Sequence, residues 1–529
     1  MKPSLRTVLL LACLGVVTVF SAATAQTISE LKVDPSLLVS LKECRRIAKY
    51  LGAQLYPGWE FEKTPILFYR PNVQELLINF PHRPAGYVDY AGFSPLGEET
   101  IYARNDSTRF TVDDQNTSIE IDSIPVLVVA DPFSSMRNQL RDVLTQRTKE
   151  FAASWLEDWS FIPNPYDKLA LILHEAFHVH QTKHAPDKSA DEMAVAQYPL
   201  LDPVNNALYV LEGSILKDAL LAGDRSLRMQ RIREFVAVRS YRHSLLDSNS
   251  VEYENLNEFV EGTAKYVEYE FLQTGEAIDP GPEMYYQTGF RGYRGVLPEM
   301  FKNRLDNMVN IVAVNDDRFG NKYGSGPLRF KLYELGACEA LLLDDVMPEW
   351  KDQIFNDGVY LSDLLGQSVN LSESELKTLL KQAKAEYGYD AAYKDKQRFE
   401  ADGRAFVQGK LDAILKTDQT LVQVWYGAVA ERLGLAYTPF GVTQIRPRAS
   451  IYDLVPIQVH FKPGMTLKMK NAVPVFIDRD QKLIAFAVAT PGADIRPDAG
   501  GELETADFVF SNATMDITRE GRIVEIRLK

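Results

Sequence analysis

The sequence predicts an α+β protein with a mostly helical centre, an antiparallel sheet near the N-terminus and a small C-terminal β domain. Between residues 65 and 131, short apolar runs separated by turn clusters are typical of strands. Between residues 205 and 272, apolar residues recur every three or four positions, which indicates amphipathic helices. After residue 447 the pattern is again that of strands, because apolar and charged residues alternate over 523–528.

In chain order, the predicted elements pass from extended to helical and back to extended. Helices are expected over 36–51, 136–159, 167–184, 205–222, 226–246, 256–272, 329–343, 373–388, 394–416 and 420–433. Strands are expected over 66–69, 118–121, 126–129, 473–478, 483–488, 508–510 and 523–528. The segment 275–327 is rich in glycine, proline and aromatic residues. We expect it to be sparsely regular, and either a cleft wall or lid or a surface insertion.

Residues 1–25 have the three parts of a signal peptide. Lys2 and Arg6 precede an apolar run, and small residues end the segment. The run is shorter than the roughly 20 residues of a membrane anchor, and it continues past Cys13, which disfavours lipidation there. We expect cleavage before Gln26 and export to the periplasm or the extracellular space, without stable membrane insertion.

Charge and cysteine content exclude two classes of protein. The formal charge is −14, and it becomes −16 once Lys2 and Arg6 leave with the signal peptide. Such a charge repels nucleic acid, so we expect no nucleic-acid partner. Only Cys44 and Cys338 remain after the signal peptide, which is too few for a disulfide scaffold. They form either one bridge or two separate buried thiols.

Four of the seven histidines lie in one predicted helix, in the run His174-Glu175-Ala176-Phe177-His178 and just after it. Residues four apart on a helix lie about 40° from each other around its axis. His174 and His178 can therefore share one metal ion. His180 and His184 lie about 200° and 240° around from His178, so we expect them on the surface or behind the site.

The glutamate between the two histidines completes a zinc-binding HExxH motif. Glu175 follows the first ligand directly, which turns its carboxylate toward the open side of the site. Zinc lowers the pKa of its bound water toward neutrality, and a nearby carboxylate can take the proton as the water attacks a carbonyl. The five residues therefore supply a ligand, a general base and a second ligand.

Zinc requires a third protein ligand, and the predicted helix 256–272 offers two carboxylates one turn apart. Either Glu258 or Glu261 could reach the metal. The segment from Glu261 to Tyr266 resembles the Glu-Gly-x-Ala segment that carries the glutamate ligand in aminopeptidase-type gluzincins. This resemblance implies Glu261 as the third ligand, and a zincin-like metallopeptidase core.

The resemblance covers residues 168–184 and 256–272, and it is to the gluzincin group as a whole. Thermolysin-like members have an aspartate four residues after the glutamate ligand, whereas this chain has Lys265. Gluzincins also place a tyrosine, histidine or arginine where it stabilises the oxyanion of the tetrahedral intermediate. Tyr333 is our candidate for that role, with Tyr323 in reserve.

These observations predict a secreted zinc metallopeptidase that binds one Zn²⁺ ion and acts on a peptide or protein substrate. Two alternatives use the same residues: a catalytically inactive surface binding protein of the same fold, and a zinc hydrolase of a non-peptide amide or ester. We expect an N-terminal α+β lobe over 26–160, a zinc-binding and mostly helical catalytic lobe over 161–446, and a C-terminal β domain over 447–529.

One further group of charged residues bears on the helical lobe. Five arginines follow one face of the predicted helix 226–246, interspersed with acidic and apolar residues. We interpret them mainly as a solvated helix face. They are Arg228, Arg231, Arg233, Arg239 and Arg242.

Overall fold

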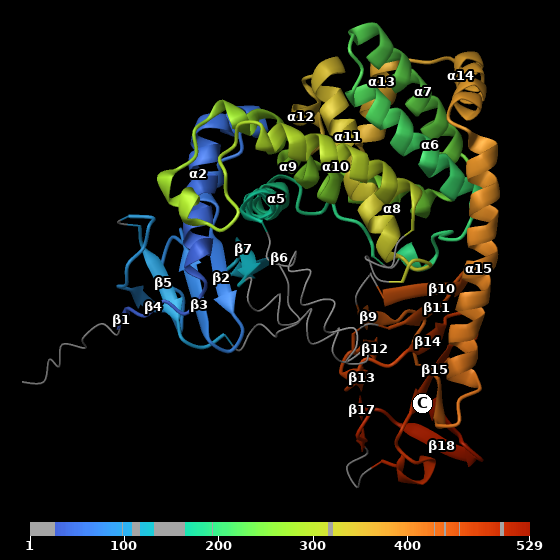
Figure 1. Ribbon diagram of the computed structural model, residues 1–529. Helices are drawn as coiled ribbons and strands as arrows, with labels where there is room; N and C mark the ends of the chain where they lie inside the picture. Colours follow the sequence, from blue (N-terminus) through green and yellow to red (C-terminus); the bar gives the residue numbers. More distant parts are fainter. Residues whose placement is uncertain are drawn as a thin grey trace, which may run out of the picture. The chain divides into compact units, whose positions relative to one another are not determined.

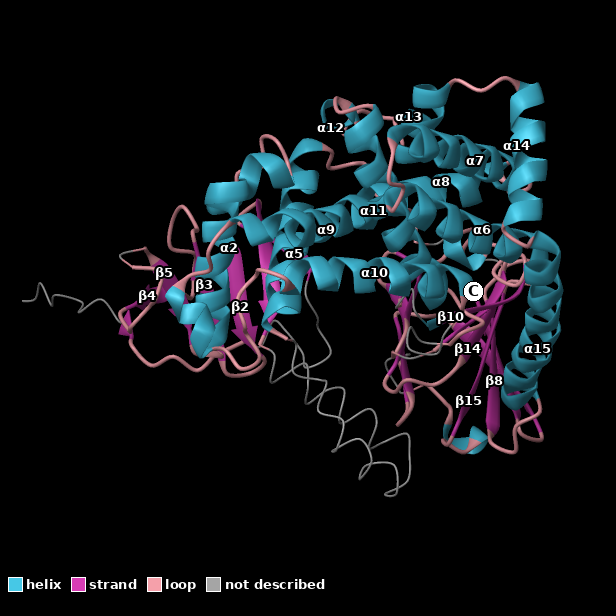
Figure 2. Cartoon of the chain, turned by 45° about the horizontal axis from the view of Figure 1, so that its top comes forward, coloured by secondary structure: helices cyan, strands magenta, loops and turns pink. Residues whose placement is uncertain are grey.

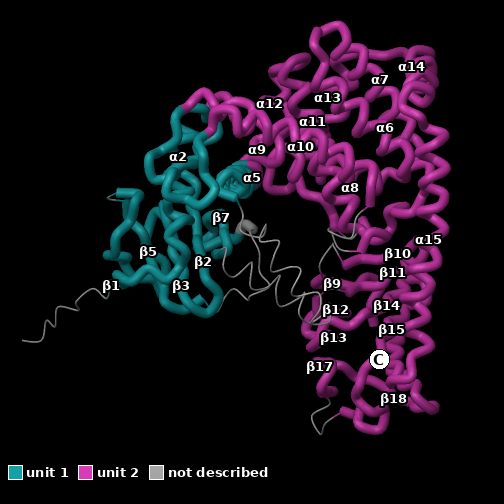
Figure 3. Tube along the Cα trace, viewed as in Figure 1, with its two compact units in different colours: residues 1–52, 58–180, 279–292 teal, residues 53–57, 181–278, 293–529 magenta. Residues whose placement is uncertain are grey.

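The computed structural model describes residues 27–97, 99–107, 117–131, 164–192, 194–315, 321–427, 429–437, 441–453, 455–497 and 502–529. The predicted signal peptide and the helix expected over 136–159 lie outside these ranges. The chain forms two compact units (Figure 3). Unit 1 comprises residues 1–52, 58–180 and 279–292, and unit 2 comprises 53–57, 181–278 and 293–529. The domain boundaries expected from the sequence stay predictions.

Unit 1 is built on a seven-stranded sheet of order β1-β4-β5-β3-β2-β7-β6 (Figure 1). The strand pairs β1–β4 and β2–β7 are parallel, so the expectation of an antiparallel sheet was wrong for these two pairs. An apolar pattern identifies which residues face the core, but it does not encode strand direction. The strands are β1 (Thr27–Ile28), β2 (Ile66–Arg70), β3 (Gln74–Ile78), β4 (Val88–Tyr90), β5 (Ile101–Arg104), β6 (Thr117–Ile121) and β7 (Ile124–Ala130).

Two helices of unit 1 pack against each other beside this sheet. Helix α2 (Pro35–Leu55) buries apolar residues at three- and four-residue spacing, and α5 (Pro165–His184) buries Leu169 and Leu173. The two helices are joined by Lys168, whose Nζ donates to Ser36 Oγ at 2.8 Å. The Cys44 thiol lies 3.7 Å from the carbonyl oxygen of Leu169.

The helices of unit 2 follow the predicted periodicity, and three of them begin at an aspartate N-cap. The side chains of Asp202, Asp224 and Asp247 each accept a hydrogen bond from a backbone N–H of the first turn. The helices that precede the β domain are α6 (Pro203–Leu220), α7 (Arg225–His243), α8 (Ser248–Asn257), α9 (Thr263–Thr274), α10 (Val296–Ala313), α11 (Gly326–Val346), α12 (Trp350–Gln353), α13 (Leu361–Val369) and α14 (Glu373–Glu386).

Two of the expected elements were wrong. Within the supposedly sparsely regular segment 275–327, residues Val296–Ala313 form helix α10, which buries Leu305 and Met308. The glycines and prolines of this segment lie almost entirely outside the helix, some before it and some after it. Residues Thr420–Trp425 form strand β8 instead of the start of a helix. Strand β8 pairs with β15 and β19. This pairing outweighs the helical spacing of apolar residues in the local sequence.

The C-terminal part of unit 2 contains two sheets, of order β10-β11-β14-β15-β8-β19-β18 and β16-β17-β13-β12-β9. The long helix α15 (Tyr389–Leu415) lies along the first sheet (Figure 2), where Ile414 joins Leu421 and Phe476 in one apolar core. The strands are β8 (Thr420–Trp425), β9 (Gly434–Ala436), β10 (Val442–Arg446), β11 (Ala449–Tyr452), β12 (Gln458–Lys462), β13 (Met465–Met469), β14 (Val475–Asp478), β15 (Leu483–Val488), β16 (Leu503–Glu504), β17 (Phe508–Ser511), β18 (Met515–Glu520) and β19 (Ile523–Leu528).

The structure decides between the two alternatives left open for the cysteines. Cys44 and Cys338 are both free thiols, and both are fully buried. Burial raises the pKa of each thiol well above its ordinary value, so both are held protonated and unreactive. Among the described residues, no helix is long and apolar enough to cross a membrane.

A close backbone contact joins α11 to the segment that carries Glu261. A Cβ atom added to Gly336 would lie 2.7 Å from the carbonyl oxygen of Glu258 and 2.9 Å from the Cα of Gly262. A Cβ added to Gly262 would lie 2.7 Å from the Cα of Gly336. Two glycines therefore allow the backbones to approach as closely as they do.

We predict that Gly336→Ala destabilises the protein by roughly 1–3 kcal/mol, because the new methyl group meets rigid backbone. The matched control is Gly409→Ala in helix α15, where an added Cβ meets nothing within 4 Å. That change should stabilise the helix by about 0.5–1 kcal/mol. Urea unfolding measures both effects, and equal midpoints for the two variants would contradict the close packing at Gly336.

Candidate metal centre

Helix α5 carries the two motif histidines on a well-buried scaffold. Asn164 caps its first turn, since its side-chain oxygen accepts from the backbone N–H of Asp167 at 2.8 Å. Most apolar residues around the motif are buried; they are Leu169, Ile172, Leu173, Ala176, Phe177 and Val179, whereas Leu171 is partly exposed. The helix is therefore fixed by packing, and the motif histidines occupy defined positions on it.

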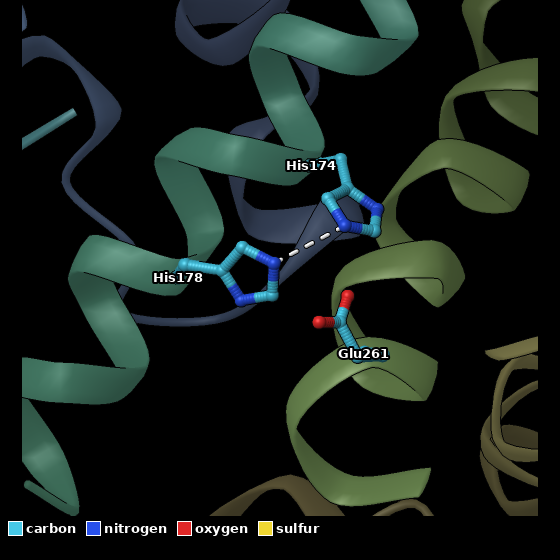
Figure 4. Close-up of side chains that lie close together, drawn as sticks. All are labelled: His174, His178 and Glu261. Carbon is cyan, nitrogen blue, oxygen red and sulfur yellow. Dashed lines mark hydrogen bonds between the residues drawn. The ribbon is translucent and has the colours of Figure 1, made fainter. Parts of the chain in front are cut away.

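The structure brings together the three residues predicted as metal ligands (Figure 4). His174 is 6% exposed, and its Nε2 lies 3.2 Å from Nε2 of His178. One possible ligand atom from each of His174, His178 and Glu261 lies within 4.8 Å of the other two. Among the described residues, no other three histidine, cysteine or acidic side chains form such a group.

A local irregularity sets the direction of Glu261. The helix predicted over 256–272 is interrupted by a π-helical turn, η3, at Glu258–Gly262. A π turn inserts an extra residue and is frequent at functional sites. Nε2 of Gln181, in the last turn of α5, donates to the carbonyl oxygens of Phe259 at 3.0 Å and Val260 at 2.8 Å. Gln181 thus satisfies carbonyl groups of the π turn and fixes its backbone.

The alternative ligand, Glu258, instead pairs with an arginine in the protein interior. Its side chain is almost fully buried, and both of its oxygens accept from Nη1 of Arg239, at 2.8 and 3.0 Å. Burial raises the pKa of Glu258 to about 7, and the charge of Arg239 opposes this rise. The structure therefore places Glu261 beside the histidines and directs Glu258 into the interior of the helical region.

Arg239 belongs to a buried ion cluster that the sequence interpretation missed. Arg239 and Arg242 were expected on a solvated helix face, yet their side chains are only 4% and 0% exposed. Their carboxylate partners come from four places in the helical region and are Glu212, Glu254, Glu258 and Glu339. The spacing of apolar residues identified the helix, but it does not show which arginines form ion pairs with buried carboxylates. Arg228, Arg231 and Arg233 form ion pairs at or near the surface.

Tyr333, the predicted oxyanion-stabilising residue, lies close to Glu261. Nη2 of Arg329 is 3.3 Å from the Tyr333 hydroxyl and 3.3 Å from Oε1 of Glu261. Burial and the Glu261 carboxylate both raise the pKa of Tyr333, so its hydroxyl stays protonated. The reserve candidate, Tyr323, instead packs against the aromatic rings of Phe399 and Phe406. The catalytic role of Tyr333 stays a prediction.

Sequence reasoning missed Arg329, although one signal pointed to it. Arg329 precedes Tyr333 by four residues on α11, so the two side chains share a helix face. Burial acts to lower the pKa of Arg329, but Tyr333, Tyr253 and Glu192 outweigh it and hold the pKa above its ordinary value. Tyr333 lies close to Glu261, so its helix neighbour Arg329 was a candidate for contact with the same carboxylate.

The two remaining histidines of α5 lie outside the ligand group, as helix geometry predicts. His180 is buried, and its ring centroid lies 5.4 Å from that of Phe177. His184 is exposed and packs against Phe355. Part of the aromatic segment after residue 275 packs onto the start of α5, where Phe290 stacks on Tyr166 at 5.1 Å.

Comparison of the chain with protein-family models, with curated proteins and with solved structures gives no significant match. The functional interpretation therefore rests on the residues and on their geometry.

We predict that Arg239→Met destabilises the protein by roughly 3–5 kcal/mol, because it leaves buried carboxylates without their cation. Arg233→Met is the matched control on the same helix, where Arg233 pairs with Glu375 and is 36% exposed. An exposed pair contributes at most about 1 kcal/mol. Urea unfolding of both variants tests the difference, and similar losses would show that Arg239 is not held as a buried cation.

Proposed function

We propose that this chain is a secreted zinc metallopeptidase in which His174, His178 and Glu261 hold one zinc ion. The observation that carries the proposal is the convergence of these three side chains, with ligand atoms within 4.8 Å of one another. Two imidazoles and one carboxylate form a donor set found in catalytic zinc sites, which leave a fourth position for water or substrate. The predicted signal peptide agrees with export.

The spacing of the histidines fits zinc. Two nitrogens, each about 2.0–2.1 Å from a tetrahedral zinc ion, lie about 3.3–3.4 Å apart. The Nε2 atoms of His174 and His178 are 3.2 Å apart. No rearrangement of α5 is therefore needed for both nitrogens to contact one ion.

The proposed reaction assigns separate tasks to the neighbouring side chains. Zinc, when bound, supplies Lewis acidity, which polarises a carbonyl and acidifies water. The carboxylate of Glu175 takes a proton from the attacking water and passes it to the leaving amide nitrogen. The Tyr333 hydroxyl, held protonated, donates a hydrogen bond to the oxygen that gains negative charge.

We predict that Glu175→Gln lowers the rate of peptide hydrolysis by about 10²–10⁴-fold, because the amide cannot accept the proton. Zinc content and unfolding should not change, since Glu175 is not a ligand. Hydrolysis of a peptide library measures the first effect, and metal analysis measures the second. Hydrolysis at the wild-type rate would remove Glu175 from the mechanism.

An assay of the wild-type protein against the peptide library and against simple amides and esters distinguishes the alternative functions. Cleavage of simple amides or esters without cleavage of any peptide would favour a non-peptide hydrolase. Zinc binding without hydrolysis of any of these substrates would favour a binding protein.

A second pair of variants tests which glutamate binds the metal. Glu261→Gln should lose zinc affinity with little change in stability, because the neutral amide is a poor ligand for zinc. Glu258→Gln should retain zinc but lose stability, because it weakens the pair with Arg239. Zinc titration and urea unfolding of both variants give the two readouts. The opposite pattern would exchange the roles of the two residues.

A further inference from the structure

A charged bridge on helix α11 lies beside the proposed metal site. The guanidinium of Arg329 donates from Nη1 to Oε1 of Glu192 and from Nη2 toward Oε1 of Glu261, at 3.3 Å. Its side chain is 10% exposed, so the bridge is mostly shielded from water. Arg329 therefore connects the proposed ligand Glu261 to a second carboxylate.

We propose that Arg329 is a positioning residue that orients the Glu261 carboxylate for zinc, and that Glu192 is its anchor. The inference rests on the proposed metal site. Hydrogen bonds that orient ligands from behind a metal site typically change metal affinity by about 10- to 100-fold.

The unequal contacts of Arg329 suit this role. A strong charge-assisted hydrogen bond is about 2.7–2.9 Å long, whereas the contact from Nη2 to Glu261 is 3.3 Å. Glu192 is the closer of the two carboxylate partners. The contact with Glu261 is thus the weaker of the two, and it constrains the direction of this carboxylate.

The anchor is itself fixed by neighbouring tyrosines. The Tyr253 hydroxyl donates to Oε2 of Glu192 at 3.3 Å, and the Tyr437 hydroxyl donates to the backbone oxygen of Glu192 at 2.6 Å. Tyr437 follows strand β9 of the C-terminal sheets. The start of α11 is held from the same region, since the backbone N–H of Ser325 donates to the oxygen of Val442 at 3.1 Å. The C-terminal strands thereby contact both Glu192 and the start of the helix that carries Arg329.

A guanidinium is required for this arrangement. Its planar fork presents two nitrogens to two different carboxylates at once, whereas the single ammonium of lysine is a point charge on a flexible stem. Arg329→Lys keeps the charge but cannot reproduce both contacts. Arg329→Met removes the charge and the contacts with Glu192, Glu261 and Tyr333, while it keeps an unbranched side chain.

The test measures zinc affinity of the purified protein by competition with a chromogenic chelator. Arg329→Met should weaken zinc binding by about 10- to 100-fold, and Arg329→Lys should recover part of this loss. The matched control is Arg304→Met, which removes an ion pair with Glu268, a carboxylate on α9. This control should bind zinc as the wild type does.

A spectroscopic readout separates positioning from general stability. With Co²⁺ in place of zinc, the visible spectrum of Arg329→Met should shift, because the direction of one ligand has changed, and that of Arg304→Met should not. Glu192→Gln should weaken zinc binding less than Arg329→Met does. The double variant should bind no more weakly than Arg329→Met alone, because Glu192 acts through Arg329.

The outcomes distinguish this inference from the proposed function. A wild-type protein that binds no zinc overturns the metal site, and the inference with it. A wild-type protein that binds zinc, with Arg329→Met unchanged in affinity and in cobalt spectrum, overturns the inference alone. If Arg329→Met does not fold, the zinc affinities of Arg329→Lys and Glu192→Gln test the positioning role instead. Wild-type affinity in both Arg329→Lys and Glu192→Gln then overturns the positioning role.

Discussion

The close crossing of helix α11 with the π turn is the constraint on which the candidate site depends. At Gly262 and Gly336 the two backbones approach so closely that neither residue can carry a side chain without displacement. This contact fixes the distance between two functional elements. Glu261 lies beside one glycine, whereas Tyr333 lies about one turn, and Arg329 about two turns, before the other. A bulkier residue at either glycine would separate Arg329 from Glu261.

The π turn gives two neighbouring glutamates opposite environments. Glu258 points into the interior, where Arg239 and Arg242 are surrounded by four carboxylates. Glu261 remains 14% exposed and joins the two histidines. Removing one partner from such a cluster leaves a buried charge uncompensated, which costs free energy. The cluster therefore holds the turn that directs Glu261.

The C-terminal strands support the candidate site through hydrogen bonds, and they supply none of its proposed metal ligands. Tyr437 holds the backbone of Glu192, and Val442 holds the first turn of α11. Both contacts lie within unit 2, and both support residues that surround Glu261. A β domain that supplies no residue to the proposed reaction can thus still contribute to its geometry.

The sequence by itself determined the local features: the motif helix with His174 and His178 on one face, most of the helices, and the sheet-forming regions. These follow from periodicity and short-range spacing, which act within a few residues. Only the tertiary structure decided the rest: the parallel strand pairs, helix α10, strand β8, the buried Arg239 cluster, the positions of Glu261 beside the histidines and of Glu258 beside Arg239, and the contact between Arg329 and Glu261. Each of these depends on which distant segment lies opposite a residue, and no local pattern encodes that partner.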